Sequence, residues 1–388
     1  MLTIELLERS YNKQSPLLAC ERDYRASLEE IGSQGVAGPI YQILKENQSL
    51  TSVPAFFKEG LERQRERHSY LNLLIKNEAE RIVAALDSEG IPAIVLKGLW
   101  LSRRLYGSSG VRQTGDVDLL IHKEQLEAAS KVLLSLGYID VDIERHSSYH
   151  HLFGKWNPST KMPIHVELHW HVVQTDYCRM ECDSLWEQSQ PLPSRDRIRE
   201  LSIPDLFYTL CLHGAKHNMA SLKHVLDIVR TIHLYGAQIS YEKLLRRARE
   251  DHLYGMVVMA LSVVYRLMPH LMRVKPFGET KTWFPWNQEL AWRKEEDYRL
   301  FRFKGLAYYL HQVLFTLGKL DLPRYRILYL WRMVFPPPEL IRIYLGRPAT
   351  DSSFGLYMRW IGRFRQAGRR KAAPARAADI IIQGEDLR

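Results

Sequence analysis

The spacing of apolar residues in the first ninety positions predicts helices. The stretch from Pro54 to Gly90 places apolar residues at helical intervals among charged ones, and Gly90 is typical of a helix C-terminal stop. The pattern then changes, since the short apolar run IPAIVLKG (Ile91–Gly98) predicts a buried strand. We therefore expect a helical segment over residues 1–90 and a different architecture after it.

Strands and helices alternate over residues 91–195. A short helix ends at Gly107, the run DVDLLI (Asp116–Ile121) predicts a second strand, and an amphipathic helix covers Lys123–Tyr138. The segments YIDVDI, YHHLFGKW and MPIHVELHWHVV predict further strands, the last two joined as a hairpin by the turn NPSTK. This order predicts an α+β fold with a small mixed sheet between helical regions.

Helical periodicity returns after the predicted sheet. Ser202 precedes an apolar run and Asp205 follows it by three positions, which is typical of a helix N-terminus. Several amphipathic segments follow, and we expect a C-terminal helical domain over residues 196–350 and a basic tail over 351–388. The stretch Arg359–Arg376 has seven basic residues and no acidic one, which fits a solvated basic helix or a nucleic-acid-binding patch.

Composition narrows the class of protein. The chain has 388 residues, 46% of them hydrophobic, which is enough for two domains with real cores. Its four cysteines do not make a disulfide scaffold, the first residues do not resemble a secretory signal, and no apolar stretch is long enough to span a membrane. We expect a cytoplasmic protein, and the formal charge of +10 favours anionic partners such as nucleotides or, less favoured, nucleic acid.

Three acidic residues carry the candidate chemistry. Asp116 and Asp118 are two positions apart, so on a strand they share one face while Val117 points into the core. Glu167 lies mid-strand in IHVELHWH, and it completes a carboxylate cluster if its strand lies beside the first. Such a cluster is a candidate site for two Mg²⁺ or Mn²⁺ ions in a two-metal nucleotidyl transfer, with Asp116, Asp118 and Glu167 as ligands. The alternative is a strand-capping aspartate and a glutamate paired with a basic neighbour.

Basic residues and a glycine turn accompany these carboxylates. Gly98 ends the first strand, where a glycine lets phosphate oxygens approach the backbone, and Lys97 and Arg112 are candidates to offset triphosphate charge. The alternatives are a surface lysine and a salt bridge from Arg112 to Asp116. His169 shares the face of Glu167, so it is a candidate to orient that carboxylate or to assist proton removal, or else it is a partly exposed strand histidine.

The motifs IPAIVLKG, RQTGDVDLLI, HVELHWH and LCLHGAKH…LKHVLDI together resemble a family of uncharacterised bacterial nucleotidyltransferases within the DNA polymerase beta superfamily. The resemblance covers roughly residues 71–234. It implies Asp116, Asp118 and Glu167 as metal ligands, with the turn at Gly98 near a triphosphate. One departure is that Leu99 stands where the superfamily usually has serine.

The resemblance implies an enzyme that moves a nucleoside monophosphate from an NTP to an acceptor and releases pyrophosphate. The acceptor is a small molecule, a peptide natural product or a protein. Lys216 and Lys223 are candidates to reach the nucleotide from the helical region, together with His217 and Asp227, although such residues are usually solvated. The alternative is a catalytically silent module that uses the same fold and its basic surface to bind nucleic acid or a protein.

Overall fold

The structure is a computed structural model that describes residues 1–141, 149–158, 162–193, 195–279, 286–292, 306–345 and 352–367. These residues form two compact units. The first comprises residues 1–292 and 306–326, and the second comprises residues 327–345 and 352–367. The division at residues 90, 195 and 350 expected from the sequence stays a prediction.

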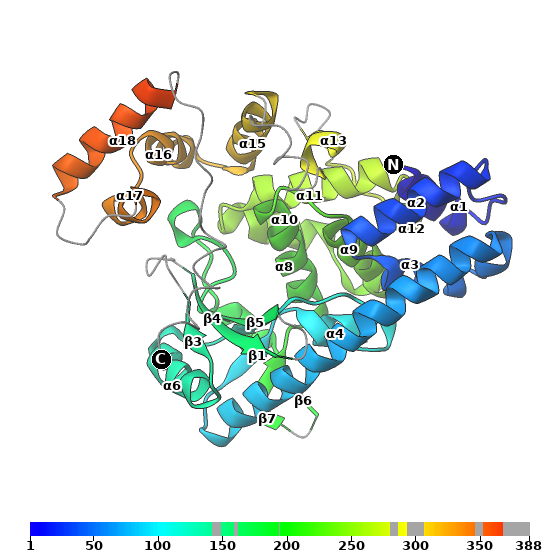
Figure 1. Ribbon diagram of the computed structural model, residues 1–388, viewed down its shortest axis with the longest axis horizontal. Helices are drawn as coiled ribbons and strands as arrows, with labels where there is room; N and C mark the ends of the chain where they lie inside the picture. Colours follow the sequence, from blue (N-terminus) through cyan, green and yellow to red (C-terminus); the bar gives the residue numbers. More distant parts are fainter. Residues whose placement is uncertain are drawn as a thin grey trace. The chain divides into compact units, whose positions relative to one another are not determined.

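The N-terminal residues are helical. A long helix follows three shorter ones, and its apolar stripe, which includes Ile75, Ala79 and Ile82, is buried against the sheet. Figure 1 shows this helix, α4, running beside the strands. The four helices are α1 (Leu2–Tyr11), α2 (Glu21–Gln34), α3 (Ala37–Glu46) and α4 (Ala55–Ser88).

Seven strands form one mixed sheet in the order β3-β4-β5-β2-β1-β7-β6. The pairs β2–β5 and β1–β7 are parallel, and the other neighbours are antiparallel. The strands are β1 (Ala93–Val95), β2 (Asp116–Leu120), β3 (Ile139–Asp140), β4 (His150–Asn157), β5 (Met162–His169), β6 (Gln190–Leu192) and β7 (Arg195–Glu200). The connecting helices are α5 (Gly98–Tyr106), α6 (Leu126–Ser135) and α7 (Asp183–Gln188).

The structure confirms the α+β class and the mixed sheet that the sequence pattern predicted. The hairpin β4–β5 also forms, with Phe153 opposite Val166. Part of its predicted turn (159–161) and most of the segment after β3 (142–148) lie outside the described residues. The hairpin β6–β7 adds two strands that the sequence pattern did not predict.

Two apolar cores cover the two faces of the sheet. Val117 and Leu119 of β2 point into the core formed with α4 and α6, whereas Leu120 and Ile94 belong to the core formed with the C-terminal helices. Because side chains alternate along a strand, Asp116 and Asp118 lie on the face of β2 opposite to Val117 and Leu119. That face of β2 is where the functional residues lie.

Helices cover this second face. Ser202 caps α8 as expected, since its hydroxyl accepts a hydrogen bond from the Asp205 amide at 3.3 Å. The helices of this region in the first unit are α8 (Ile203–Lys216), α9 (Leu222–Tyr235), α10 (Tyr241–Glu250), α11 (Tyr254–Leu267), α12 (Leu271–Val274), α13 (Gln288–Ala291) and α15 (Leu306–Lys319).

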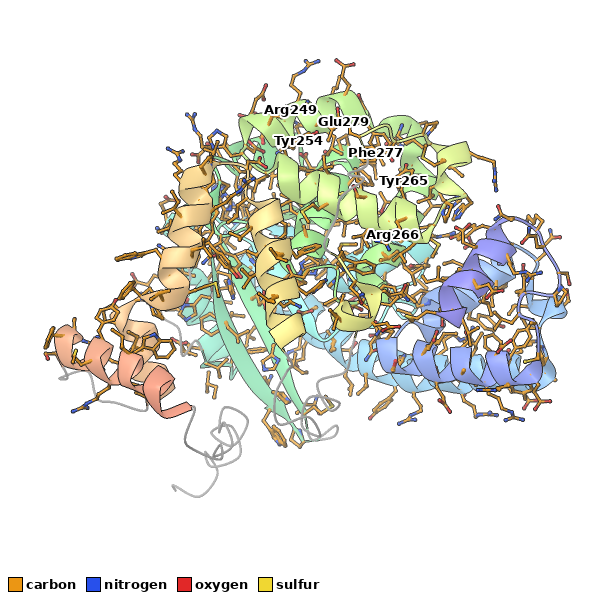
Figure 2. The ribbon with its side chains drawn as sticks, turned by 90° about the horizontal axis from the view of Figure 1, so that it is seen from above. Arg249, Tyr254, Tyr265, Arg266, Phe277 and Glu279 are labelled. Atoms are coloured by element: carbon orange, nitrogen blue, oxygen red, sulfur yellow. The ribbon has the colours of Figure 1, made fainter. Side chains whose placement is uncertain are left out.

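The chain after α12 folds back over the ends of α10 and α11, where Figure 2 shows the side chains concerned. Arg249 of α10 forms an ion pair with Glu279 at 3.1 Å, and the Tyr254 hydroxyl at the start of α11 donates a hydrogen bond to the same carboxylate. Phe277 packs against the ring of Tyr265, with ring centroids 5.5 Å apart. These contacts fix the outer edge of the helical layer, away from the sheet.

The second unit consists of α16 (Pro323–Val334, which starts in the first unit), α17 (Pro338–Leu345) and α18 (Ser353–Ala367). Ile341 and Leu356 are fully buried between α17 and α18. Most of the predicted basic tail, residues 368–388, lies outside the described residues. In the described part of the chain, none of the helices combines the length and the apolar character that crossing a bilayer requires.

Candidate active site

The pairing of β2 with β5 brings two of the three acidic candidates, Asp118 and Glu167, together. In the parallel register of β2 and β5, Asp118 lies opposite Glu167 and Asp116 lies opposite His165. Parallel neighbours in register place their side chains on the same face about 5 Å apart. The condition stated from the sequence, that the strand of Glu167 lies beside that of Asp116, is therefore met.

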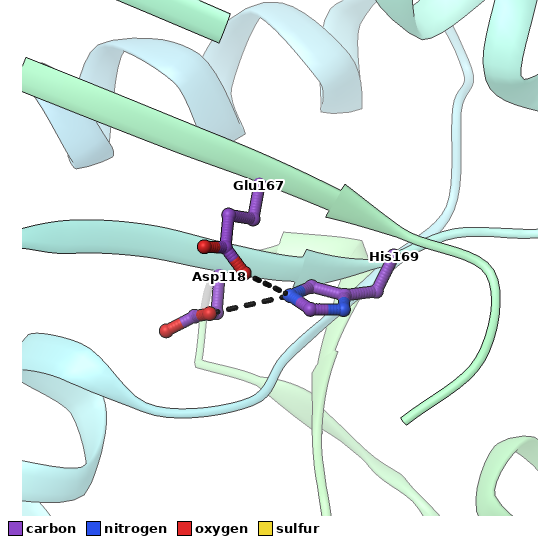
Figure 3. Close-up of side chains that lie close together, drawn as sticks. All are labelled: Asp118, Glu167 and His169. Carbon is purple, nitrogen blue, oxygen red and sulfur yellow. Dashed lines mark hydrogen bonds and ion pairs between the residues drawn. The ribbon is translucent and has the colours of Figure 1, made fainter. Parts of the chain in front are cut away.

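His169 joins Asp118 and Glu167 into one cluster, drawn in Figure 3. Its Nε2 lies 3.2 Å from Asp118 Oδ1 and 2.9 Å from Glu167 Oε2. One ligand atom from each residue lies within 4.8 Å of the others, which is close enough for all three to hold one ion. Asp118 Oδ2 and His169 Nδ1 are buried and lack a hydrogen-bond partner among the described residues, so the cluster has unused ligand capacity.

Lys97, at the end of β1, already compensates part of this negative charge. Its Nζ lies 3.0 Å from Asp118 Oδ1 and 3.4 Å from His213 Nδ1. Burial lowers the pKa of Lys97, but the charges of Asp118 and Asp116 outweigh that effect and raise it, so the ammonium stays protonated. Burial likewise raises the pKa of Asp118, yet Lys97 and His169 together hold it far below its usual range.

Asp116 stands apart from the cluster of three. It lines the same pocket, but it does not belong to the group whose ligand atoms lie within 4.8 Å. Repulsion from Asp118 and then burial raise the pKa of Asp116, with Lys97 opposing them. The structure thus brings Asp118 and Glu167 together with His169, and leaves Asp116 at the edge of the group.

The pocket beside these carboxylates has a volume of about 170 Å³ and a second wall of nitrogen-bearing side chains from α8 and α9. Burial lowers the pKa values of His213 and His224 well below the usual value and that of His217 to about 3, so the three rings are neutral at pH 7. The pocket is lined by Lys97, Arg112, Asp116, Asp118, His213, His217, Lys223 and His224.

The two lysines expected from the helical region both lie at the site. Lys223 lines the main pocket, and Lys216 lines a small adjoining cavity together with Lys97 and His169. Burial lowers the pKa of each, followed by repulsion from Arg112 for Lys223 and from Lys97 for Lys216. Acidic side chains therefore face basic ones across one small polar pocket. His224 was not singled out from the sequence, because nothing distinguishes it from an ordinary buried histidine.

Arg112 lines the pocket, but its side chain is bound to another residue. Its Nε and Nη2 donate to the two carboxylate oxygens of Asp227 at 2.8 and 2.7 Å, and both residues are buried. The salt bridge considered from the sequence, to Asp116, is therefore not formed. Nor is Asp227 solvated, as helix-face polar residues usually are, since it is buried and bound to the guanidinium of Arg112.

Asn72 of α4 fixes the loop that leads into β2, a role that no pattern in the sequence indicates. Its amide donates to the carbonyls of Gly110 and Arg112 at 3.0 and 3.1 Å and accepts from the Thr114 amide at 3.0 Å. At the other turn, Gly98 has φ +70°, a conformation that favours glycine. It starts α5 and is not among the residues that line the pocket.

Comparison with known proteins gives one match, to a protein family. A family model described as an uncharacterised nucleotidyltransferase matches residues 21–269, which include both walls of the pocket. No curated protein and no solved structure gives a significant match to the chain. The match extends the resemblance noted for residues 71–234 in both directions, so that it includes α2 to α4 and also α10 and α11.

Proposed function

Because the chain belongs to the uncharacterised nucleotidyltransferase family, we propose that it transfers a nucleoside monophosphate from an NTP to an acceptor hydroxyl, with release of pyrophosphate. One observation supports this most strongly: Asp116 and Asp118, the second of which lies opposite Glu167 on the neighbouring strand, line a pocket whose other wall bears Lys223 and three neutral histidines. Membership of the DNA polymerase beta superfamily, with residues 91–195 as the catalytic domain, is part of the proposal.

The proposal includes a divalent cation, Mg²⁺ or Mn²⁺. The donor set fits such an ion, because the carboxylates supply hard oxygen ligands and Asp118 Oδ2 is buried without a partner. Asp118 and Glu167 would hold the cation, with Asp116 at the edge of the site. When bound, such an ion neutralises phosphate charge and lowers the pKa of the attacking hydroxyl.

The protein's own residues have separate roles in this scheme. Lys223 and Lys216 lie where they can pair with the phosphates that an NTP brings into the pocket. His169 orients the carboxylate of Glu167 through its 2.9 Å contact. Lys97 neutralises Asp118 before the nucleotide binds, and it is positioned to exchange that carboxylate for a phosphate oxygen. Arg112 acts through Asp227 to hold the loop, and is a positioning residue.

The test is a turnover assay with each of the four NTPs, labelled in the α-phosphate, with Mg²⁺ or Mn²⁺ and with a cell extract as the source of acceptor. Pyrophosphate release and label transfer are expected for the wild type and lost in Glu167→Gln. The matched control Glu124→Gln changes an exposed acid just past β2 and is expected to keep full turnover. Equal turnover in Glu167→Gln and the wild type would contradict the proposal.

A second candidate is a catalytically silent binding module with the same fold. The observation that favours it is the pairing of Asp118 with Lys97 and His169, which compensates the carboxylate without any metal. Such a module either binds NTP without divalent cations or binds no NTP at all, and in both cases it releases no pyrophosphate. Calorimetric titration of NTP with and without Mg²⁺, alongside the turnover assay, distinguishes the two.

A further inference from the structure

An apolar face of α16 is left uncovered. Four apolar side chains recur at intervals of three, four and seven positions, which places them on one side of the helix. Each is between 44% and 68% exposed, although a stripe of this kind normally faces a core. The four residues are Ile327, Leu330, Trp331 and Val334.

A second uncovered stripe lies on α18 in the same unit. Phe354, Met358 and Ile361 share one face of that helix and are between 39% and 78% exposed. Other residues of α18 make the contacts inside the unit. The Tyr357 hydroxyl donates a hydrogen bond to the Pro336 carbonyl at 2.7 Å, and Leu356 is fully buried. The unit therefore packs through one side of α18 and leaves the other side unused.

Positive charge is concentrated in the same part of the sequence. The stretch from Arg324 to Arg376 contains twelve basic residues and two acidic ones, Glu339 and Asp351. This difference equals the net charge of the whole chain, +10, so the remaining residues balance. Exposed apolar stripes within a strongly basic stretch of sequence are typical of helices that lie in the interface of an anionic membrane.

We propose that the second unit, α16 to α18, binds the surface of a lipid bilayer that contains anionic headgroups. The two apolar stripes enter the boundary between headgroups and acyl chains, and the net positive charge of this stretch attracts the anionic headgroups. This inference goes beyond the proposed nucleotidyl transfer and does not depend on it. It requires no membrane-spanning segment.

Chemistry favours lipid over the other occupants of such a surface. Nucleic-acid interfaces are polar. Trp331 and Phe354 can stack on bases, but the other five side chains of the two stripes are aliphatic and neither stack on bases nor form hydrogen bonds with them. A second copy of the chain would bring two strongly basic surfaces together, which Coulomb repulsion opposes. An anionic bilayer satisfies the apolar and the basic residues together.

The experiment is co-sedimentation of the full-length protein with two kinds of vesicle. One kind contains phosphatidylcholine alone, and the other contains phosphatidylcholine with about one third phosphatidylglycerol. Binding is expected with the anionic vesicles, and it is expected to fall at high salt because charge contributes. The variant Trp331→Ser/Phe354→Ser, with one change in each stripe, is expected to bind these vesicles at least about tenfold more weakly than the wild type. Leu134→Ser, which removes a similarly exposed leucine from α6, is the matched control and is expected to bind like the wild type.

Met358→Asp provides a second variant, because the Trp331 ring also packs on Phe335 and its loss can disturb the unit. Circular dichroism checks that each variant folds. The proposal is overturned if the wild type does not bind anionic vesicles, or if Met358→Asp binds them as well as the wild type does. It is also overturned if the variants instead lose binding to single-stranded RNA, or if they convert a dimer to a monomer in light scattering.

Discussion

Asp118 and Glu167, forty-nine positions apart in the sequence, lie opposite each other on the parallel strands β2 and β5. His169 bridges them, and Lys97 contacts Asp118 at 3.0 Å. The two carboxylates therefore carry compensated charge before any cation or nucleotide arrives. This arrangement determines how variants of the site are expected to affect stability as well as activity.

Two neighbouring aspartates are expected to respond oppositely to the loss of their charge. Asp118→Asn leaves the buried Lys97 without its anion, so we expect the free energy of unfolding to fall by about 3 kcal/mol. Asp116→Asn removes a charge that is repelled by Asp118, so we expect stability to stay the same or to rise. Urea unfolding of both variants checks this, and an equal loss of stability in the two would contradict it.

Lys223 is expected to lower the stability of the folded protein and, at the same time, to contribute to nucleotide binding. Because burial lowers its pKa, replacing it with an apolar residue of similar length removes a desolvation cost. We expect Lys223→Met to melt at or above the wild-type temperature while KM for the NTP rises at least about tenfold. The control Lys243→Met changes an exposed lysine on α10 and should leave KM unchanged. An unchanged KM in Lys223→Met would remove Lys223 from the nucleotide site.

The buried pair of Arg112 and Asp227 is expected to show strong coupling. Asp227→Asn leaves a buried guanidinium unpaired, and we expect a loss of about 3–5 kcal/mol in the free energy of unfolding. Arg112→Met is expected to cost a similar amount, whereas Arg112→Met with Asp227→Leu should recover most of that stability. A double-mutant cycle in urea, with Arg112→Met and Asp227→Leu as the single variants, measures the coupling. Additive effects would show that the pair does not hold the loop.

The free energy of unfolding is expected to fall in mild acid because His233 has a lowered pKa in the folded protein. Burial, and then repulsion from His270 and Arg230, lowers its pKa from 6.5 to about 4. The unfolded chain therefore binds a proton between pH 6.5 and 4 that the folded protein does not, so acid favours unfolding. Its Nε2 lies 2.9 Å from His270 Nε2, and its ring stacks on Tyr11.

The expected loss at this histidine is about 2 kcal/mol between pH 7 and pH 4, less than the whole shift corresponds to, because the ring keeps some contact with water. His233→Gln should flatten this part of the stability profile. Urea unfolding at several pH values, with His122→Gln as a reference at a half-buried histidine far from His233 in the sequence, makes the comparison. A profile as steep in His233→Gln as in the wild type would assign the pH dependence to other groups.

The sequence predicted the strands that carry the site because their side chains alternate clearly. In DVDLLI, apolar Val117 and Leu119 fix which face Asp116 and Asp118 occupy. The sequence could not predict β6 and β7, since Ile198 is the one fully buried side chain of β7 and the rest of RDRIRE is polar. A strand that buries so few side chains leaves almost no hydrophobic pattern to recognise.

The partners of charged residues were harder to predict than the strands. Arg112 is four positions from Asp116 and 115 positions from Asp227, and only the packing of α9 against α5 brings the second carboxylate within reach. His169 was visible on the face of Glu167, but its contact with Asp118 depends on the pairing of β2 with β5. Sequence patterns report local alternation, whereas ion pairs depend on tertiary placement.

Binding of Mn²⁺ tests the central claim, that Asp118 and Glu167 hold the cation used with the NTP, most directly. Free Mn²⁺ is followed by electron paramagnetic resonance as full-length protein is added with a non-hydrolysable NTP analogue. We expect the wild type and Glu124→Gln to bind Mn²⁺ alike, and Asp118→Asn and Glu167→Gln to bind it at least about tenfold more weakly. Equal Mn²⁺ binding by all four proteins, or none by the wild type, would contradict the account.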